Sequence, residues 1–164
     1  MSDPLGAFSR KLDTNWRVAL PDPLLDVYPR KLILCPGLDR SIRIYRSDKW
    51  DEFERDLKKL NRNNPRHAEY IRFFRSMAQT ITLDTNNRFR FSDPLMKWAG
   101  LGEDNRNVVI FDSVDYLEAW EEERWDKYME AQSEQIKELA LSIYGDLTGS
   151  GDEHAAGEAP AGTG

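Results

Sequence analysis

The chain has 164 residues, of which 40% are hydrophobic and 32% are charged, a composition typical of a small soluble protein. Its single cysteine, Cys35, excludes an intrachain disulfide and a cysteine-cluster metal site. The formal net charge is −6, but it is unevenly distributed: residues 1–120 carry +2 and residues 121–164 carry −8. Because local charge governs contacts with polyanions, the acidic total does not exclude a nucleic-acid partner.

The first residues, Met-Ser-Asp-Pro-Leu-Gly, lack a basic segment followed by an apolar core, so we expect no signal peptide. No apolar run approaches the ~20 residues that a membrane-spanning helix needs. These features favour a cytoplasmic protein with no membrane partner.

Catalytic chemistry finds little support in the sequence. His67 and His154 stand apart from other candidate bases or ligands, no nucleophile–base grouping emerges, and there is no glycine-rich phosphate loop. We therefore predict no catalytic residue, no metal site, no cofactor and no small-molecule substrate, which means a protein that is not an enzyme.

Short strands and turns are predicted for the first part of the chain. Residues 10–20 are expected to form a hairpin-like unit around a polar turn, and residues 21–26 a short helical turn. Residues 32–35 and 41–45 are predicted as strands, joined by the turn at residues 36–37.

Two helices are predicted next. Ser47 is expected to cap the first helix, whereas Asn64 caps the second and Pro65 takes its first position. Each helix has an apolar face, which we interpret as hydrophobic core rather than as a ligand pocket. The faces consist of Trp50, Phe53, Leu57 and Leu60, and of Tyr70, Phe73, Phe74 and Met77.

The second half is predicted to repeat this order. Strands are expected at residues 107–111 and 116–120, followed by a long helix that begins near residues 121–123 and ends at Gly145. Apolar residues in this helix alternate spacings of three and four, which indicates a heptad seam. Packing against the chain's own sheets and contact with another subunit both remain open for it. The seam consists of Trp125, Met129, Gln132, Ile136, Leu139 and Ile143.

Residues 83–95 repeat residues 12–24. Eight of the thirteen positions are identical without a gap, where composition alone would match roughly one. Each copy opens with a polar Asp-Thr-Asn turn, continues with an arginine (Arg17 or Arg88), and closes with Asp-Pro, which disfavours helix before the proline and suits a helix start after it.

The repeat divides the chain into residues 8–78, residues 79–147 and an acidic Gly/Ala tail at 148–164 that has little to bury and is predicted to be disordered. One copy of about 60–70 residues buries too little surface to be securely stable alone. We therefore predict an α+β fold in which two tandem β/α halves share one core around a pseudo-twofold axis, with a long C-terminal helix.

The paired Asp-x-x-x-Arg turns, Asp13 to Arg17 and Asp84 to Arg88, resemble those of the MraZ family of bacterial transcriptional regulators, in the AbrB-like, swapped-hairpin DNA-binding group. Ala-Gly-Leu at 99–101 and the Asn64-Pro65 junction match as well, and the resemblance covers about residues 8–145. It implies a nucleoid-associated homo-oligomer, arranged as a closed ring, that binds double-stranded DNA at repeated promoter elements upstream of division and cell-wall genes.

Arg17 and Arg88 are the predicted DNA-contacting residues, because the arginine fork can bind guanine O6 and N7 in the major groove or grip a phosphate. Alternatively, each arginine pairs only with its own aspartate four residues earlier and holds the turn. The two roles are compatible, with Asp13 and Asp84 orienting the turns.

Several neighbours of the turns are weaker candidates. Asn15 and Asn86 could contact adenine edges or serve only to form the turn. Arg10, Lys11 and Arg90 could neutralise phosphates, although a solvated charged face would explain them nearly as well.

The sequence departs from the family pattern at the turns. The family usually has glycine just before the arginine, often preceded by lysine in the first half, whereas Asn15-Trp16 and Asn86-Asn87 stand here. Asparagine tolerates a left-handed backbone and tryptophan is expected to resist it. A second hypothesis is therefore a ring-forming interaction scaffold that has lost DNA recognition.

Overall fold

The computed structural model describes residues 4–152. The chain divides into two compact units, one that ends at Trp125 and one that begins at Asp126. Most of the predicted tail, residues 153–164, lies outside the described residues. Among the helices within residues 4–152, none combines the length and apolar character that crossing a membrane requires.

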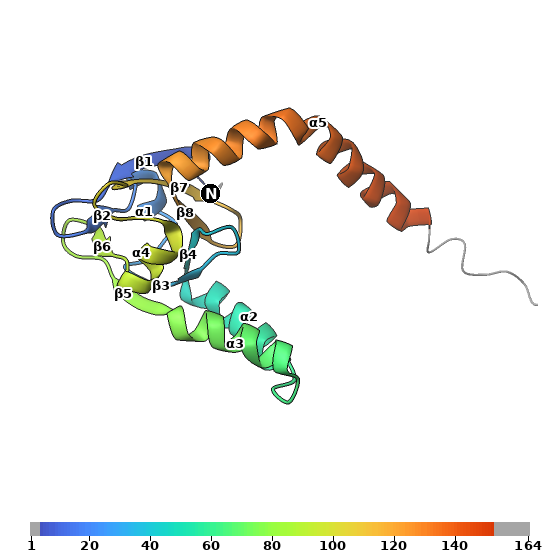
Figure 1. Ribbon diagram of the computed structural model, residues 1–164, viewed down its shortest axis with the longest axis horizontal. Coiled ribbons are helices and arrows are strands. Elements are labelled where there is room, and N and C mark those ends of the chain that lie inside the picture. Colours follow the sequence, from blue (N-terminus) through green and yellow to red (C-terminus); the bar gives the residue numbers. More distant parts are fainter. Residues whose placement is uncertain (1–3, 153–164) are drawn as a thin grey trace, which may run out of the picture. The chain divides into compact units, whose positions relative to one another are not determined.

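The first repeat and the second repeat have the same order of elements (Figure 1). In the first, the order is β1 (Ala7–Lys11), β2 (Arg17–Ala19), α1 (Asp22–Leu25), β3 (Lys31–Pro36), β4 (Ile42–Tyr45) and α2 (Ser47–Lys58). After the connecting α3 (Pro65–Met77), the second gives β5 (Gln79–Thr82), β6 (Arg88–Arg90), α4 (Asp93–Ala99), β7 (Asn107–Asp112), β8 (Leu117–Glu121) and α5 (Glu122–Asp152). The predicted α+β fold of two tandem halves is confirmed.

Strands are exchanged between the repeats. The six-stranded sheet has the order β1-β7-β8-β4-β3-β5, so the first strand of each repeat pairs antiparallel with the third strand of the other. A separate two-stranded sheet joins β2 to β6. The predicted hairpin over residues 10–20 is therefore wrong: its turn forms, but β1 and β2 pair with partners in the second repeat. This exchange covers the edges of β3 and β7, which would otherwise present unpaired backbone groups.

The strand registers locate a pseudo-twofold axis. In the β4–β8 pair, Arg43 lies opposite Glu118, its counterpart in the other repeat. In the β2–β6 pair, Val18 lies opposite Phe89, which is again its own counterpart. A residue can face its equivalent only where a twofold axis passes, so the predicted symmetry is confirmed.

One hydrophobic core is built from both repeats. Equivalent residues fill it in pairs, and each is at most 3% exposed: Leu12 with Leu83, Val18 with Phe89, Leu20 with Phe91, and Leu24 with Leu95. Strand alternation explains the set: Phe89 points inward between two exposed arginines on β6, and Val18 points inward between the exposed Arg17 and the half-buried Ala19 on β2.

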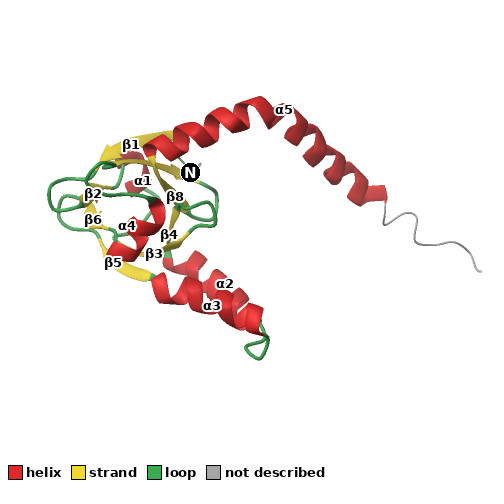
Figure 2. Ribbon diagram, viewed as in Figure 1, coloured by secondary structure: helices red, strands yellow, loops and turns green. Residues whose placement is uncertain are grey.

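A second cluster lies where α2 and α3 pack side by side against β3 and β4 (Figure 2). Trp50, Leu57 and Phe74 are buried, which confirms them as core, whereas Tyr70 is 41% exposed. Burial raises the pKa of the Cys35 thiol in this cluster to about 12, so the thiol stays protonated and unreactive.

The helix starts follow the predicted chemistry with one correction. Asn64 caps α3 as predicted, because its side chain accepts a hydrogen bond from the Arg66 N–H at 3.0 Å. The N-cap of α2 is Arg46 rather than Ser47, and no side chain caps that end. Ser47 is instead the first helical residue, followed by Asp48, whose carboxylate suits the positive end of the helix dipole.

The long helix α5 begins as predicted but ends later. The Glu121 carboxylate accepts hydrogen bonds from the N–H groups of Glu123 and Arg124, both at 3.0 Å. The helix then continues through Gly145 to Asp152, so the predicted end at Gly145 is wrong, and residues 148–152 of the predicted tail are helical. A glycine costs roughly 1 kcal/mol inside a helix but ends one mainly when its backbone turns left-handed, which Gly145 does not do.

Because the two repeats share one core, we expect them to unfold together. Leu20→Ala and Phe91→Ala, at equivalent buried positions, should each lower the free energy of unfolding by about 2–5 kcal/mol, because each leaves a cavity in the same core. Denaturant titration followed by hydrogen exchange should show both repeats opening together in either variant. A separate early transition confined to the mutated repeat would mean that the halves have independent cores.

Candidate functional site

The two predicted turns have nearly the same geometry, built around an aspartate. Asp13 Oδ1 accepts hydrogen bonds from the N–H groups of Asn15 at 2.8 Å and Arg17 at 2.9 Å. Asp84 Oδ1 accepts the equivalent bonds from Asn86 and Arg88 at the same distances. One carboxylate oxygen therefore closes each turn.

The residue before each arginine has a left-handed backbone, with φ of 63° at Trp16 and 59° at Asn87. Trp16 adopts this conformation although a tryptophan finds it harder than a glycine does. The Arg106 guanidinium lies over the indole, 4.0 Å from the ring centroid. A cation–π contact worth about 0.5–2 kcal/mol offsets a left-handed penalty of roughly 1–2 kcal/mol.

The arginine side chains cross between the repeats. Arg17 Nη1 lies 3.5 Å from Asp84 Oδ2, and Arg88 Nη1 lies 3.3 Å from Asp13 Oδ2. The alternative in which each guanidinium pairs with its own aspartate is thus incorrect: the aspartate binds its own arginine's backbone N–H and the other arginine's side chain. These long, exposed ion pairs are weak because solvent screens them, and the Arg17 and Arg88 side chains remain 53% and 48% exposed.

The β2–β6 ribbon gathers three of the predicted residues. Arg17 lies opposite Arg90, and Arg88 lies opposite Ala19. Because Val18 and Phe89 face the core, the alternating arginines face outward. Arg17, Arg88 and Arg90 also line one shallow cavity of about 290 Å³ beside the turns. A two-stranded ribbon thus presents three guanidinium groups together.

The remaining predicted residues lie around this ribbon. Asn15 and Asn86 are exposed at the turns, where their backbone N–H groups help to close them. Lys11 is exposed just before the first turn. Arg10 lies on β1, opposite Val108, and donates to the Ser9 carbonyl at 2.7 Å, so it belongs to the large sheet rather than to the ribbon.

Each turn aspartate is held in its charged form. The backbone N–H of Arg17 contributes most to lowering the pKa of Asp13, and the N–H of Asn15 and the guanidinium of Arg88 add to it against a partial desolvation. The pKa of Asp84 is lowered in the same way, first by the N–H of Arg88 and then by that of Asn86 and the charge of Arg17. Carboxylates that accept two backbone bonds are stabilised as anions.

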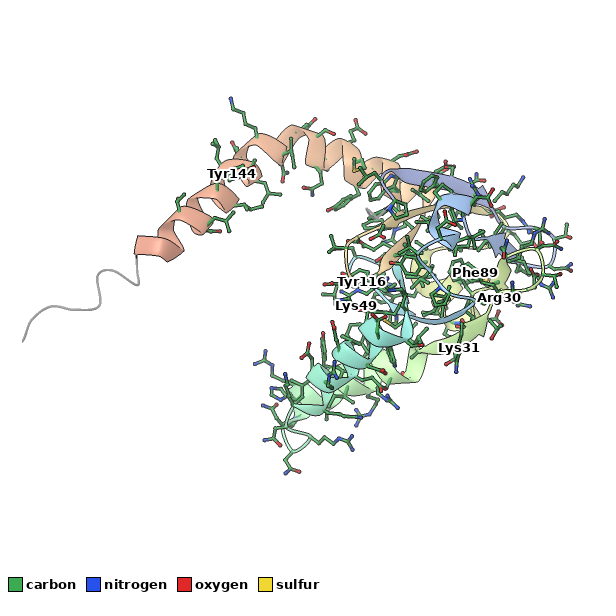
Figure 3. The ribbon with its side chains drawn as sticks, turned by 180° about the vertical axis from the view of Figure 1, so that it is seen from behind. Arg30, Lys31, Lys49, Phe89, Tyr116 and Tyr144 are labelled. Atoms are coloured by element: carbon green, nitrogen blue, oxygen red, sulfur yellow. The ribbon has the colours of Figure 1, made fainter. Side chains whose placement is uncertain are left out.

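Two arginines that sequence reasoning missed connect the turns to the opposite repeats. Arg30, in the first repeat, donates to the carbonyls of Leu83 at 2.6 Å and Asp84 at 2.8 Å. Arg106, in the second repeat, donates to the Asp13 carbonyl at 2.9 Å. Figure 3 shows Arg30 at the same end of the unit as Phe89 of β6. The sequence signal was their equivalent position, because each arginine immediately precedes the third strand of its repeat.

The fold and the site together define a tandem-repeat, strand-exchanged β/α protein whose two Asp–Arg turns form one composite surface. A family model described as "MraZ protein, putative antitoxin-like" matches residues 5–73 and 74–141, which are the two repeats. The chain belongs to the MraZ family.

Named relatives extend this assignment. The chain is 31% identical over 143 residues to a protein of Clostridium tetani named transcriptional regulator MraZ, covering 84% of this chain and 99% of that one. A protein of Thermus thermophilus with the same name is 32% identical over 127 residues, covering 77% and 88% of the two chains. A third, from Mycolicibacterium smegmatis, is 28% identical over 130 residues, covering 79% and 89%.

Arg106 and Arg30 should each support one turn. Arg106→Ala removes the hydrogen bond to the Asp13 carbonyl and the guanidinium over the Trp16 ring. The Arg17 amide should therefore exchange faster, and the free energy of unfolding should fall by about 1–3 kcal/mol. Arg30→Ala, the matched control, should affect the Arg88 amide instead. Hydrogen exchange followed by NMR would check this crossed pattern, and equal effects of both variants on both turns would contradict it.

The lowered pKa values of Asp13 and Asp84 predict how stability depends on pH in the acidic range. Their folded pKa values are depressed, so the unfolded chain binds more protons in the acidic range; their stabilising contribution is present above the ordinary pKa and is lost as pH falls through the folded value. Carboxyl carbon shifts followed by NMR should place both midpoints below 3.8, the ordinary value. Asp13→Asn and Asp84→Asn assign the signals. A midpoint at or above that value would mean that the carboxylate is not held by the turn.

Proposed function

We propose that the chain is a sequence-specific DNA-binding transcriptional regulator. The observation that carries the proposal is the β2–β6 ribbon, on which Arg17, Arg88 and Arg90 face outward beside two turns held in fixed geometry. Two-stranded ribbons fit the DNA major groove, and arginine there can bind guanine through two hydrogen bonds. The relatives' names support a regulator rather than an enzyme.

The residues divide by role in this proposal. Arg17 and Arg88 contact base edges, and their weak ion pairs to Asp84 and Asp13 hold the guanidinium groups in place until DNA competes for them. Arg90 and Lys11 lie close enough to the turns in the chain to contact flanking phosphates. Arg10 has the weakest support, because it is only partly exposed on β1 and donates to the Ser9 carbonyl.

We further propose that copies assemble into a ring, act on repeated promoter elements upstream of a division and cell-wall gene cluster, and are cytoplasmic and nucleoid-associated. One ribbon offers few base contacts, so several ribbons on one particle must bind tandem repeats together to reach useful affinity. The alternative, a ring-forming scaffold without DNA recognition, rested on the glycine and lysine that the turns lack. Its support is weaker because Trp16 and Asn87 keep the left-handed backbone that glycine would provide.

Replacing the two principal arginines tests the proposal. Arg17→Ala with Arg88→Ala should lower affinity for the promoter region upstream of the protein's own gene by roughly 5- to 150-fold per arginine, since each bidentate contact is worth about 1–3 kcal/mol. Wild-type binding should weaken steeply with salt as counterions are released. Fluorescence anisotropy across a salt series measures both effects.

A matched control uses two cations of α5. Arg124→Ala with Lys127→Ala removes the same charge from an acidic helix and should change DNA affinity far less. If the ribbon variant binds the promoter repeats as tightly as wild type, the turns are structural and the scaffold is the better interpretation.

A further inference from the structure

The distal part of α5 carries an apolar stripe that is largely exposed. Ile136, Leu139 and Ile143 are 56%, 45% and 47% exposed. Their spacing of three and four residues places them on one face of the helix. Trp125 of the predicted seam lies within the first unit and packs against Phe111 at 4.6 Å and Trp120 at 5.4 Å between ring centroids. The rest of the stripe has the form of a helix that binds a groove.

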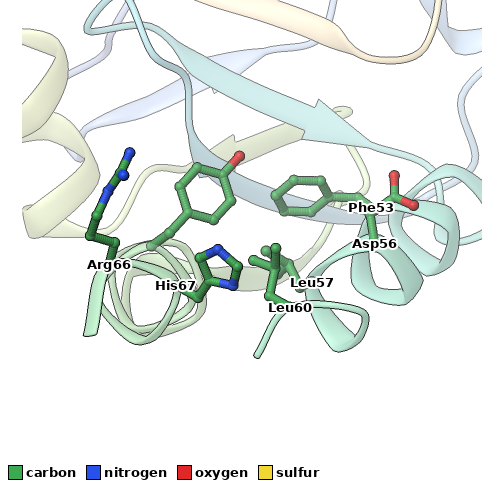
Figure 4. Close-up of a pocket in the computed structure, with 7 residues that line it drawn as sticks. Phe53, Asp56, Leu57, Leu60, Arg66 and His67 are labelled. Atoms are coloured by element: carbon green, nitrogen blue, oxygen red, sulfur yellow. The ribbon is translucent and has the colours of Figure 1, made fainter. Parts of the chain in front are cut away.

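A groove of matching chemistry lies between α2 and α3. Its cavity of about 450 Å³ is lined by Phe53, Leu57, Leu60 and Tyr70, with Asp56, Arg66 and His67 around them (Figure 4). That volume is within the range of roughly 300–1,000 Å³ that binding pockets occupy.

Contacts within the chain hold the walls of the groove. Phe74 packs against Phe53 at 5.5 Å and against Tyr70 at 4.7 Å between ring centroids. His67 Nδ1 accepts a hydrogen bond from the Asn61 N–H at 3.0 Å, and this bond joins the loop to the start of α3. Little ordering is therefore needed when an apolar helix enters.

The charges of the two surfaces are opposite. Residues 126–152 carry six acidic and two basic side chains, a net −4, whereas residues 47–77, which form α2, α3 and their connection, carry eight basic and six acidic, a net +2. Asp146 lies three residues after Ile143, on the same helix face, and Arg66 lies at the groove. Within the described residues, no ion pair of the Arg66 or Asp146 side chain is found.

We propose that α5 of one copy docks into the α2–α3 groove of a second copy, with Ile136, Leu139 and Ile143 in the groove and Asp146 beside Arg66. The inference specifies the surfaces of the assembly and rests on the self-association part of the proposed function. The two patches differ, so the contact is heterologous: each copy gives a helix to one neighbour and a groove to another. Such a contact either closes into a ring or continues as a filament.

Complementation between two defective variants tests this directly. Ile136→Glu with Ile143→Glu damages the helix face only, and Leu60→Glu damages the groove only. Each variant alone should be monomeric at micromolar concentration, because both halves of every contact are needed. Mixed together they should form a one-to-one dimer through the one intact pair, detectable by light scattering and sedimentation velocity.

The control is Leu141→Glu, which places the same charge at a 65% exposed leucine two residues away from both Leu139 and Ile143, on another face of α5. It should assemble as wild type does. A second pair of variants avoids any effect on packing: Arg66→Glu and Asp146→Arg should each weaken association about tenfold, and the double variant should recover most of the loss.

Several outcomes would overturn the inference. A groove variant that still self-associates means that α5 pairs with α5, and a mixture that stays monomeric means that helix and groove do not meet. A monomeric wild type removes the assembly altogether. Salt-dependent DNA binding, measured in parallel, separates the two proposals: a variant that fails to dock should keep the weak binding of a single ribbon, and docking should persist when the Arg17 and Arg88 variant loses DNA.

Discussion

Each repeat gives its first strand to the other, and the rest of the structure depends on that exchange. Because β1 lies on β7 and β5 lies on β3, the Asp–Arg turn that follows each exchanged strand is carried across the pseudo-twofold axis. Only then can Arg17 reach Asp84 and Arg88 reach Asp13. The composite surface is a product of the swap, and neither repeat alone contains it.

The sequence was informative wherever a feature is local. Internal identity located the repeat, Asn64-Pro65 located a helix start, and Asp-Pro located the short helices α1 and α4, because capping and turn chemistry depend on residues close in the chain. Strand exchange has no such local signature. The pattern around residues 10–20 is the same whether the second strand pairs within its own repeat or with the other repeat. The incorrect prediction of a hairpin therefore followed from the residues alone.

The same limit explains what was missed at the site. Arg30 and Arg106 contact turns more than fifty residues away, so no spacing rule connects them to Asp84 or Asp13. Trp16 was judged by its intrinsic backbone preference, which a cation over its ring counteracts. Gly145 was judged in the same way, and helix on both sides of it outweighs a cost of roughly 1 kcal/mol.

The two turns have the same backbone conformation but present different side chains. The first presents an indole supported by Arg106, and the second presents an amide at Asn87, while Arg30 holds that turn through carbonyl oxygens. The symmetry that brings the turns together therefore relates unlike surfaces. A ligand that contacts both at once meets an asymmetric site with one aromatic and one polar half, and its preferred orientation is set by residues that the repeat does not share.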